Sequence, residues 1–174
     1  MSGPLPWSLR TTEIPETGLH KTVSATEAER SAVARALGLV SCEAIEADYR
    51  VRALGAGRYR LAGTLRARVT QVCVATLEPI PQEIAEEFEV QFWPPDALTE
   101  TGEEEVEVSI VPDVEPIEHG TIEVGRVVFE TLSAALDPYP RKSGATLEWQ
   151  DPESAEEPGA SGPFAALKKL KDQA

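Results

Sequence analysis

Several features that mark whole classes of protein are missing from this sequence of 174 residues. No apolar run approaches the roughly 20 residues that a membrane-spanning helix requires. The opening stretch MSGPLPWSLRTTEIPE has no basic region followed by an apolar core, unlike a secretory signal. Phosphate-loop, dinucleotide-binding, nucleophile-elbow and zinc-protease motifs are all absent. We therefore expect a cytoplasmic protein that is not an enzyme and takes no cofactor, small-molecule substrate or membrane partner.

Positive charge and metal-binding side chains are also scarce. The chain has 16 Lys and Arg against 30 Asp and Glu, which gives a formal net charge of -14. This balance disfavours nonspecific attraction to nucleic acid or anionic membranes, and it favours a basic protein partner. Structural zinc sites usually present their ligands in close pairs. The two cysteines and two histidines are widely separated, so we expect no bound metal.

The length suits one domain with a tail. We assign residues 1–150 to a single α+β domain and residues 151–174 to a flexible acidic linker with a short C-terminal motif. Near the start, the stretch 24–41 predicts a helix, capped by Ser24 or Thr26 and ended near Gly38. Glu27 and Glu29 suit its first turn.

The clearest local pattern is an antiparallel hairpin that follows this helix. Apolar and charged residues alternate on both sides of the glycine turn 55–57, as in two paired strands with one buried face. The residues predicted to point inward are Ile45, Ala47, Tyr49, Val51, Ala53, Tyr59, Leu61, Leu65, Ala67 and Val69.

Two more strands and a second helix follow the hairpin. Phe88, Val90 and Phe92 predict one strand, and the alternation in residues 106–110 predicts another. From Ile122 the apolar period becomes helical, and Pro138 ends that segment. The predicted fold is thus an α+β domain: an antiparallel sheet of about four strands, an N-terminal helix, a second helix after the strands, and a short C-terminal helix on a flexible linker.

The C-terminal stretch PFAALKKLKDQA is the candidate partner-binding motif. Proline suits the first position of a helix, and the apolar residues recur at three-residue spacing, so they share one helical face. Such a short helix is marginal alone and gains order by docking, either on its own sheet or on a partner. The candidate residues are Phe164, Leu167, Leu170, Lys168 and Lys171.

Arginines of the hairpin are the candidate RNA-binding residues. Because they all have even numbers, they share one face of the two strands, and guanidinium groups bind phosphates through paired hydrogen bonds. The alternative is a balanced charged surface, in which Glu87 and Glu89 on the next strand neutralise Arg66 and Arg68. The candidates are Arg50, Arg52, Arg58, Arg60, Arg66 and Arg68.

Cys73 ends the hairpin, and Thr76 stands where a second cysteine would complete a metal-binding knuckle. Its position favours the apolar face of the strand. A buried free cysteine there behaves as a small hydrophobic residue rather than as a reactive thiol.

Three segments of the chain resemble the YceD family of large ribosomal RNA subunit accumulation proteins. They are VTQVCVATLEPI, GTIEVGRVVFETLSAALDPYPRKSG and GPFAALKKLK, and they occur in the order expected for that family. The family commonly has C-x-x-C before L-E-P, and this chain lacks the second cysteine. The resemblance implies a noncatalytic ribosome-biogenesis factor, with large-subunit ribosomal RNA or a pre-ribosomal particle as partner. The alternative is an acidic protein-binding module or chaperone for a basic ribosomal protein.

Overall fold

The computed structural model describes residues 3–99 and 113–146 of the chain. The elements, in chain order, are β1 (Leu9–Arg10), the short 3-10 helix η1 (Thr11–Glu13), β2 (Leu19–Ser24), α1 (Glu27–Leu37), β3 (Ser41–Gly55), β4 (Arg58–Val72), β5 (Pro79–Trp93), α2 (Pro95–Thr99), β6 (Val114–Pro116), β7 (Thr121–Ile122) and α3 (Val124–Ala135).

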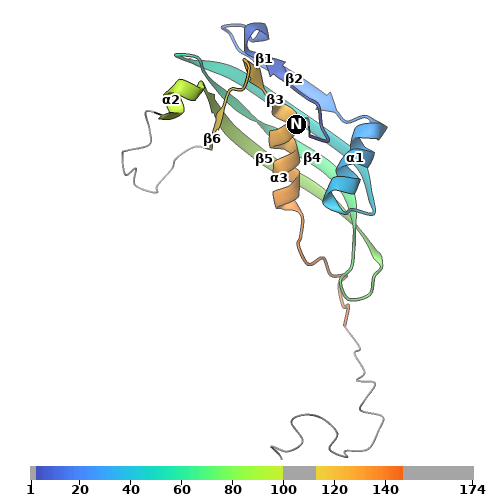
Figure 1. The fold of residues 1–174 in the computed structure, drawn as a ribbon. Helices are drawn as coiled ribbons and strands as arrows, with labels where there is room; N and C mark the ends of the chain where they lie inside the picture. Colours follow the sequence, from blue (N-terminus) through green and yellow to red (C-terminus); the bar gives the residue numbers. More distant parts are fainter. Residues whose placement is uncertain (1–2, 100–112, 147–174) are drawn as a thin grey trace, which may run out of the picture.

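The main sheet has five strands in the order β2-β3-β4-β5-β6 (Figure 1). The first four are antiparallel neighbours, whereas β6 is parallel to β5 over Gln91–Trp93. β1 and β7 form a separate two-stranded sheet. The predicted antiparallel sheet of about four strands is therefore wrong: the sheet is mixed, and the helix α2 was also missed. A parallel neighbour needs a crossover connection, which no local pattern reveals.

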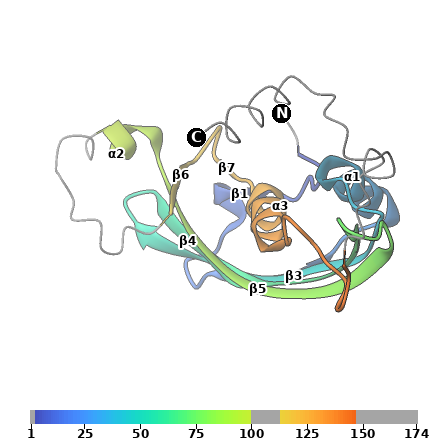
Figure 2. The same ribbon diagram turned by 90° about the horizontal axis from the view of Figure 1, so that it is seen from below.

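The sheet is strongly curved, and α1 and α3 lie on its concave side (Figure 2). The apolar stripe of α3 faces the sheet, with Val124, Val127, Val128 and Leu132 all buried. Opposite them lie the large buried side chains of the strands, among them Tyr49 and Phe92. On the convex side no helix of the described segments covers the strands. The sheet thus has one face in the core and one in solvent, which explains the alternation along β3 and β4.

The predicted first helix and hairpin are confirmed. Thr26 caps α1 in a capping box with Glu29, and Gly38 ends the helix in the left-handed conformation with φ of 65°. Between β3 and β4, Ala56 and Gly57 both have positive φ, which suits the twist of a tight hairpin. Ala53 is the one predicted inward residue of β3 that is exposed, because a register shift follows it.

The N-terminal segment packs across α3, which the sequence patterns did not indicate. The backbone N–H of Gly125 donates to the carbonyl of Trp7 at 2.8 Å, and a Cβ at Gly125 would lie 2.0 Å from the carbonyl oxygen of Leu5. Glycine is required there because the two backbones approach so closely. The Trp7 indole also donates to Glu29 of α1 at 3.1 Å, so this segment links the two helices.

The predicted second helix is confirmed as α3. The predicted strand at residues 106–110, the linker and the C-terminal motif lie outside the described residues, so the division at residue 150 stays a prediction. Over residues 3–99 and 113–146, no helix has the length and apolar character to cross a membrane.

Candidate nucleic-acid interface

The hairpin arginines lie on the convex face of the sheet. Tyr49 and Val51 of β3, and Leu61 and Leu65 of β4, are buried on the concave side. The arginines occupy the intervening positions, so their side chains point away from α1 and α3. The structure thus brings to one face all six predicted residues, Arg50, Arg52, Arg58, Arg60, Arg66 and Arg68.

Four of these arginines gather at the end of the sheet nearest the β3–β4 turn. Arg52 and Arg60 are direct cross-strand partners, Arg58 is opposite Gly55, and Arg50 is opposite Ala62. Directly opposed like charges on two strands destabilise a sheet. An anion bound between them relieves this repulsion, so the pair suits a phosphate ligand.

The side chain of Trp93 belongs to the same surface. The guanidinium of Arg58 lies 4.1 Å from the centre of the Trp93 ring, in a cation–π contact. The indole Nε1 of Trp93 donates to Oε1 of Gln91 at 3.0 Å, which holds the ring on β5. We call Arg50, Arg52, Arg58, Arg60 and Trp93 the tip platform.

Sequence reasoning missed Trp93. A signal was present, because Trp93 follows Phe92 at the end of a strand with inward aromatic residues. A neighbour of an inward residue points outward. The approach to Arg58 depends on the register between β4 and β5, in which Tyr59 is paired with Phe92.

The carboxylates of β5 do not neutralise the arginines in the predicted way. Glu89 pairs with Arg60, not with Arg66 or Arg68, and Glu87 is opposite Thr64. The hydrogen bond from Arg60 lowers the pKa of Glu89, so this carboxylate stays ionised. Among the described residues, no carboxylate oxygen lies within 4.0 Å of the charged nitrogens of the other five arginines.

The half of the convex face away from the turn has mixed charge. Arg66 is opposite Glu46, and Arg68 is opposite Glu83. Glu43, at a bulge beside Arg68, accepts hydrogen bonds from Ser41 and Thr70; the bond from Ser41 is the main cause of its lowered pKa. The basic character of the face is therefore concentrated in the tip platform.

A polar cluster lies beside the tip platform, where β2 meets β3. Asp48 accepts a hydrogen bond from the hydroxyl of Thr22 at 2.7 Å, and its carboxylate lies 3.0 Å from Nε2 of His20. These contacts, with that of Thr22 first, lower the pKa of Asp48. Sequence reasoning did not identify His20 as a candidate site residue, because it lies in no motif. His119 has a positive φ and is exposed in a turn.

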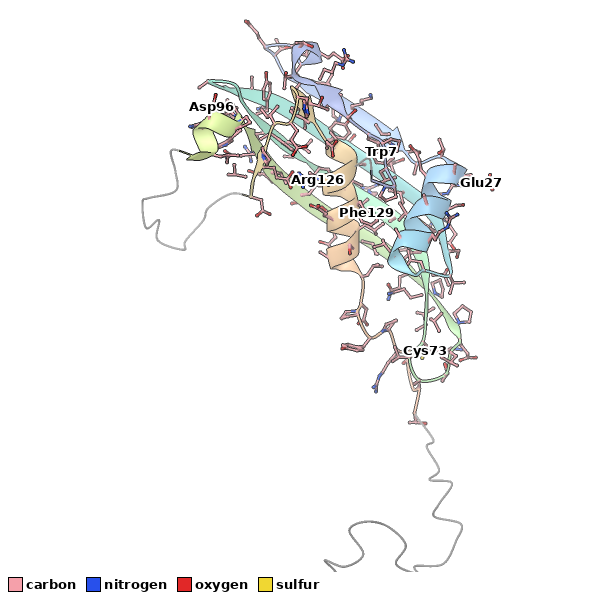
Figure 3. All side chains as sticks on the ribbon, viewed as in Figure 1. Trp7, Glu27, Cys73, Asp96, Arg126 and Phe129 are labelled. Atoms are coloured by element: carbon pink, nitrogen blue, oxygen red, sulfur yellow. The ribbon has the colours of Figure 1, made fainter. Side chains whose placement is uncertain are left out.

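Cys73 is fully buried, but it is not part of the main cluster of core side chains. It follows β4 in the turn toward β5, beside the chain that leaves α3 (Figure 3). Its sulfur accepts the backbone N–H groups of Thr76 and Lys142, each at 3.4 Å. Hydrogen bonding from the Thr76 side chain and then from the Lys142 N–H lowers the pKa of the thiol to about 7.

The prediction that Cys73 is a buried free cysteine is confirmed, although it lies just after the end of β4 rather than on the strand. Its surroundings are polar backbone groups that stabilise a thiolate. Thr76, at the position of the missing second cysteine, supplies one of these groups. In the described segments, no three His, Cys, Asp or Glu side chains are grouped to hold a metal ion.

A family model described as large ribosomal RNA subunit accumulation protein YceD matches residues 61–171. The chain belongs to the YceD family. The match begins within β4, so it includes Arg66, Arg68 and Trp93, and it extends through α3 into the predicted C-terminal motif. It confirms the resemblance seen in the sequence, and the family description links this chain to accumulation of the large ribosomal RNA subunit. No curated protein and no solved structure matches the chain.

Proposed function

We propose that this protein is a noncatalytic assembly factor that supports accumulation of large-subunit ribosomal RNA by binding that RNA on its convex face. The observation that carries the proposal is the tip platform. Arg52 faces Arg60 across two strands, and of the four platform arginines only Arg60 has a carboxylate partner among the described residues. The partner class comes from the family, whose description names large-subunit ribosomal RNA.

The chemistry of the platform suits RNA. Guanidinium groups bind phosphate oxygens through two parallel hydrogen bonds and also stack on bases. Aromatic and arginine planes are the usual surfaces on which unpaired RNA bases stack. Arg58 and Trp93 already form such a stacked pair at 4.1 Å, so part of the surface is ordered before RNA binds.

The noncatalytic character is part of the same proposal. The convex carboxylates with a shifted pKa, such as Asp48 and Glu89, are held ionised by hydrogen bonds. A group that is fully ionised near pH 7 is a poor general acid. These side chains therefore suit the orientation of neighbouring groups rather than proton transfer, and the proposed site of action is the cytoplasm, where subunits assemble.

A second candidate function, the binding of a basic ribosomal protein, is favoured by the acidic character of β5. This strand carries Glu83, Glu86, Glu87 and Glu89, and only Glu89 forms an ion pair among the described residues. Glu89 is also the carboxylate partner of Arg60, so the acidic strand adjoins the tip platform on the convex face.

The test compares the full chain with a variant in which Arg50, Arg52, Arg58 and Arg60 are all changed to Gln. Binding to fragments of large-subunit ribosomal RNA is measured over a range of salt concentrations. Each phosphate contact that is lost also removes released counterions, so the slope of log K against log[salt] should fall by about 0.7 per contact. We expect weaker binding and a shallower slope.

The control is a variant with the same change in charge elsewhere, in which four exposed basic residues are changed to Gln: Arg10, Lys21, Arg35 and Arg141. If the convex face binds RNA, the control keeps most of the affinity and slope of the natural chain. Equal effects of the two variants, or no effect of the tip-platform variant, would contradict RNA binding on this face.

A further inference from the structure

Among the described residues, one long edge of the main sheet is mostly unpaired. β5 runs from Pro79 to Trp93, but β6 pairs only with its last three residues, Gln91–Trp93. Within residues 3–99 and 113–146, no strand pairs with Pro79–Val90 on that side. Unpaired backbone N–H and C=O groups on such an edge form a template for a further strand.

The backbone groups that face this edge follow from two hydrogen bonds to the β6 segment. The N–H of Gln91 donates to the carbonyl of Asp113, and the carbonyl of Trp93 accepts from Ile117, both at 2.8 Å. The register of β5 with β4 has no shift, so every second residue before Gln91 faces the same way. Four residues thus present an N–H and a C=O to the open edge: Glu83, Ala85, Glu87 and Glu89.

The two prolines of β5 fall in the same series. Pro79 and Pro81 would also direct their nitrogen toward the open edge, where a proline has no N–H to donate. They close the first part of the edge to pairing. The part that remains available therefore extends from Glu83 to Glu89.

Charge on this edge selects the kind of strand that fits. Charged side chains commonly protect an open edge from pairing with copies of itself. Here all the charged side chains, Glu83, Glu86, Glu87 and Glu89, are negative. They disfavour an acidic strand, including a second copy of this chain, and they attract a basic one.

A groove of about 600 Å³ continues this edge on the concave side, between β5 and the C-terminal half of α3. Phe88, Val90 and Val127 contribute its apolar part, whereas Glu86 and Glu130 contribute carboxylates. Two of its lining carboxylates, Glu115 and Glu130, are paired with Arg126. The groove therefore suits apolar and basic side chains.

We propose that the edge from Glu83 to Glu89, with this groove, binds an extended basic segment of another protein by strand addition. The bound strand would alternate, because successive side chains of a strand point to opposite faces of the sheet. Side chains on one face of the bound strand would lie beside the carboxylates of Glu87 and Glu89 on the convex side. Side chains on its other face would enter the groove toward Val90. This inference develops the second candidate function above, and its failure would leave the RNA-binding proposal intact.

The test measures binding of the full chain to a labelled peptide of alternating lysine and valine, long enough to span Glu83–Glu89, by fluorescence anisotropy. One control peptide has glutamate in place of lysine. The other is N-methylated at every second residue, which removes the hydrogen bonds of one strand edge but keeps the charge. We expect the N-methylated peptide to bind at least about tenfold more weakly, since several backbone hydrogen bonds are lost.

Two variants of the protein complete the test. Ala85→Pro removes one N–H of the open edge without touching the hydrogen bonds to β4, and should weaken binding about tenfold. The double change Glu86→Gln and Glu87→Gln should weaken it about fivefold, whereas Glu16→Gln with Glu27→Gln, at exposed sites elsewhere, should not. If Ala85→Pro fails to fold, the N-methylated peptide still tests the backbone contact.

Three results would overturn the proposal. Equal binding of the normal and N-methylated peptides would mean simple charge attraction. Dimerisation of the natural chain that Ala85→Pro abolishes would mean that a second copy occupies the edge. A gain in peptide affinity of about tenfold on changing Lys168, Lys169 and Lys171 to Gln would mean that the basic C-terminal motif of this chain is the occupant.

Discussion

The contact between Arg58 and Trp93 leads to the most specific prediction about the tip platform. Trp93→Leu keeps an apolar side chain on β5 but removes the aromatic face on which the guanidinium of Arg58 lies, 4.1 Å from the ring centre. It also removes the hydrogen bond from Nε1 to Gln91. We expect the variant to fold, to lose stability, and to bind large-subunit ribosomal RNA more weakly although no charge has changed.

The magnitude follows from the geometry. A cation–π contact is worth about 0.5–1 kcal/mol at exposed sites and more where water is excluded. Both side chains are half-buried, so we expect about 1 kcal/mol for their interaction. For a chain of this length, a loss of 1 kcal/mol lowers the melting temperature by about 2–4 °C.

A double-mutant cycle separates this interaction from the other effects of each change. Urea denaturation is measured for the natural chain, Trp93→Leu, Arg58→Gln and the double variant, and the departure from additivity gives the coupling energy. We expect about 0.5–1 kcal/mol. RNA affinity is measured on the same four proteins.

Additive changes within about 0.3 kcal/mol would refute the contact as a stabilising interaction. Unchanged RNA affinity for Trp93→Leu, together with a clear loss for Arg58→Gln, would show that the ring takes no part in RNA binding. The proposed stacking surface would then be reduced to its four arginines.

Three further predictions concern other parts of the molecule. Because Arg52 directly faces Arg60, Arg52→Gln should raise the melting temperature at low salt, and this gain should vanish at high salt. Arg50→Gln is the control, since Arg50 is opposite Ala62 on β4, and it should give no such gain. A fall in melting temperature for Arg52→Gln would contradict the repulsion between the two arginines. The folded-state pKa of Cys73 is lowered from 9.0 to about 7, so the stability that its thiolate contributes is full above about pH 9 and is lost as the pH falls through about 7. The difference in melting temperature between the natural chain and Cys73→Ser should therefore grow as the pH rises over this window, and a difference independent of pH would rule out the thiolate. Changing Phe164, Leu167 and Leu170 to Ala in the C-terminal motif should reduce association with assembling large subunits in sedimentation assays and leave the melting temperature nearly unchanged; a large fall in melting temperature would mean that these side chains belong to the core.

Local sequence patterns were sufficient to predict the elements whose stabilising contacts all lie within one short segment. Thr26 with Glu29 and then Gly38 specify the start and end of α1 through contacts within a few residues. The turn at Ala56 and Gly57 brings β3 and β4 together without help from distant residues. The placement of the six arginines on one face follows from the same hairpin, since the alternation of a strand is a local property.

Contacts between distant segments decided the rest of the candidate site. β4 and β5 are joined by the turn at Cys73, whose sulfur accepts the backbone N–H of Lys142, a residue distant in the sequence. The register of β4 with β5 places Glu89 near Arg60 rather than Arg66, and Trp93 beside Arg58. A shift in register would change every one of these pairs, because each contact requires two residues at the same level of adjacent strands.

The sequence by itself therefore determined the hairpin, the two larger helices, the arginine face and the YceD resemblance. Each of these rests on periodicity, on caps or on motifs that lie within one short stretch. Only the tertiary structure decided that β6 runs parallel to β5 over three residue pairs and that no other described strand pairs with the edge from Glu83 to Glu89. Pairing of that kind depends on chain closure over a long crossover, and the free energy of closure is not encoded in either strand alone.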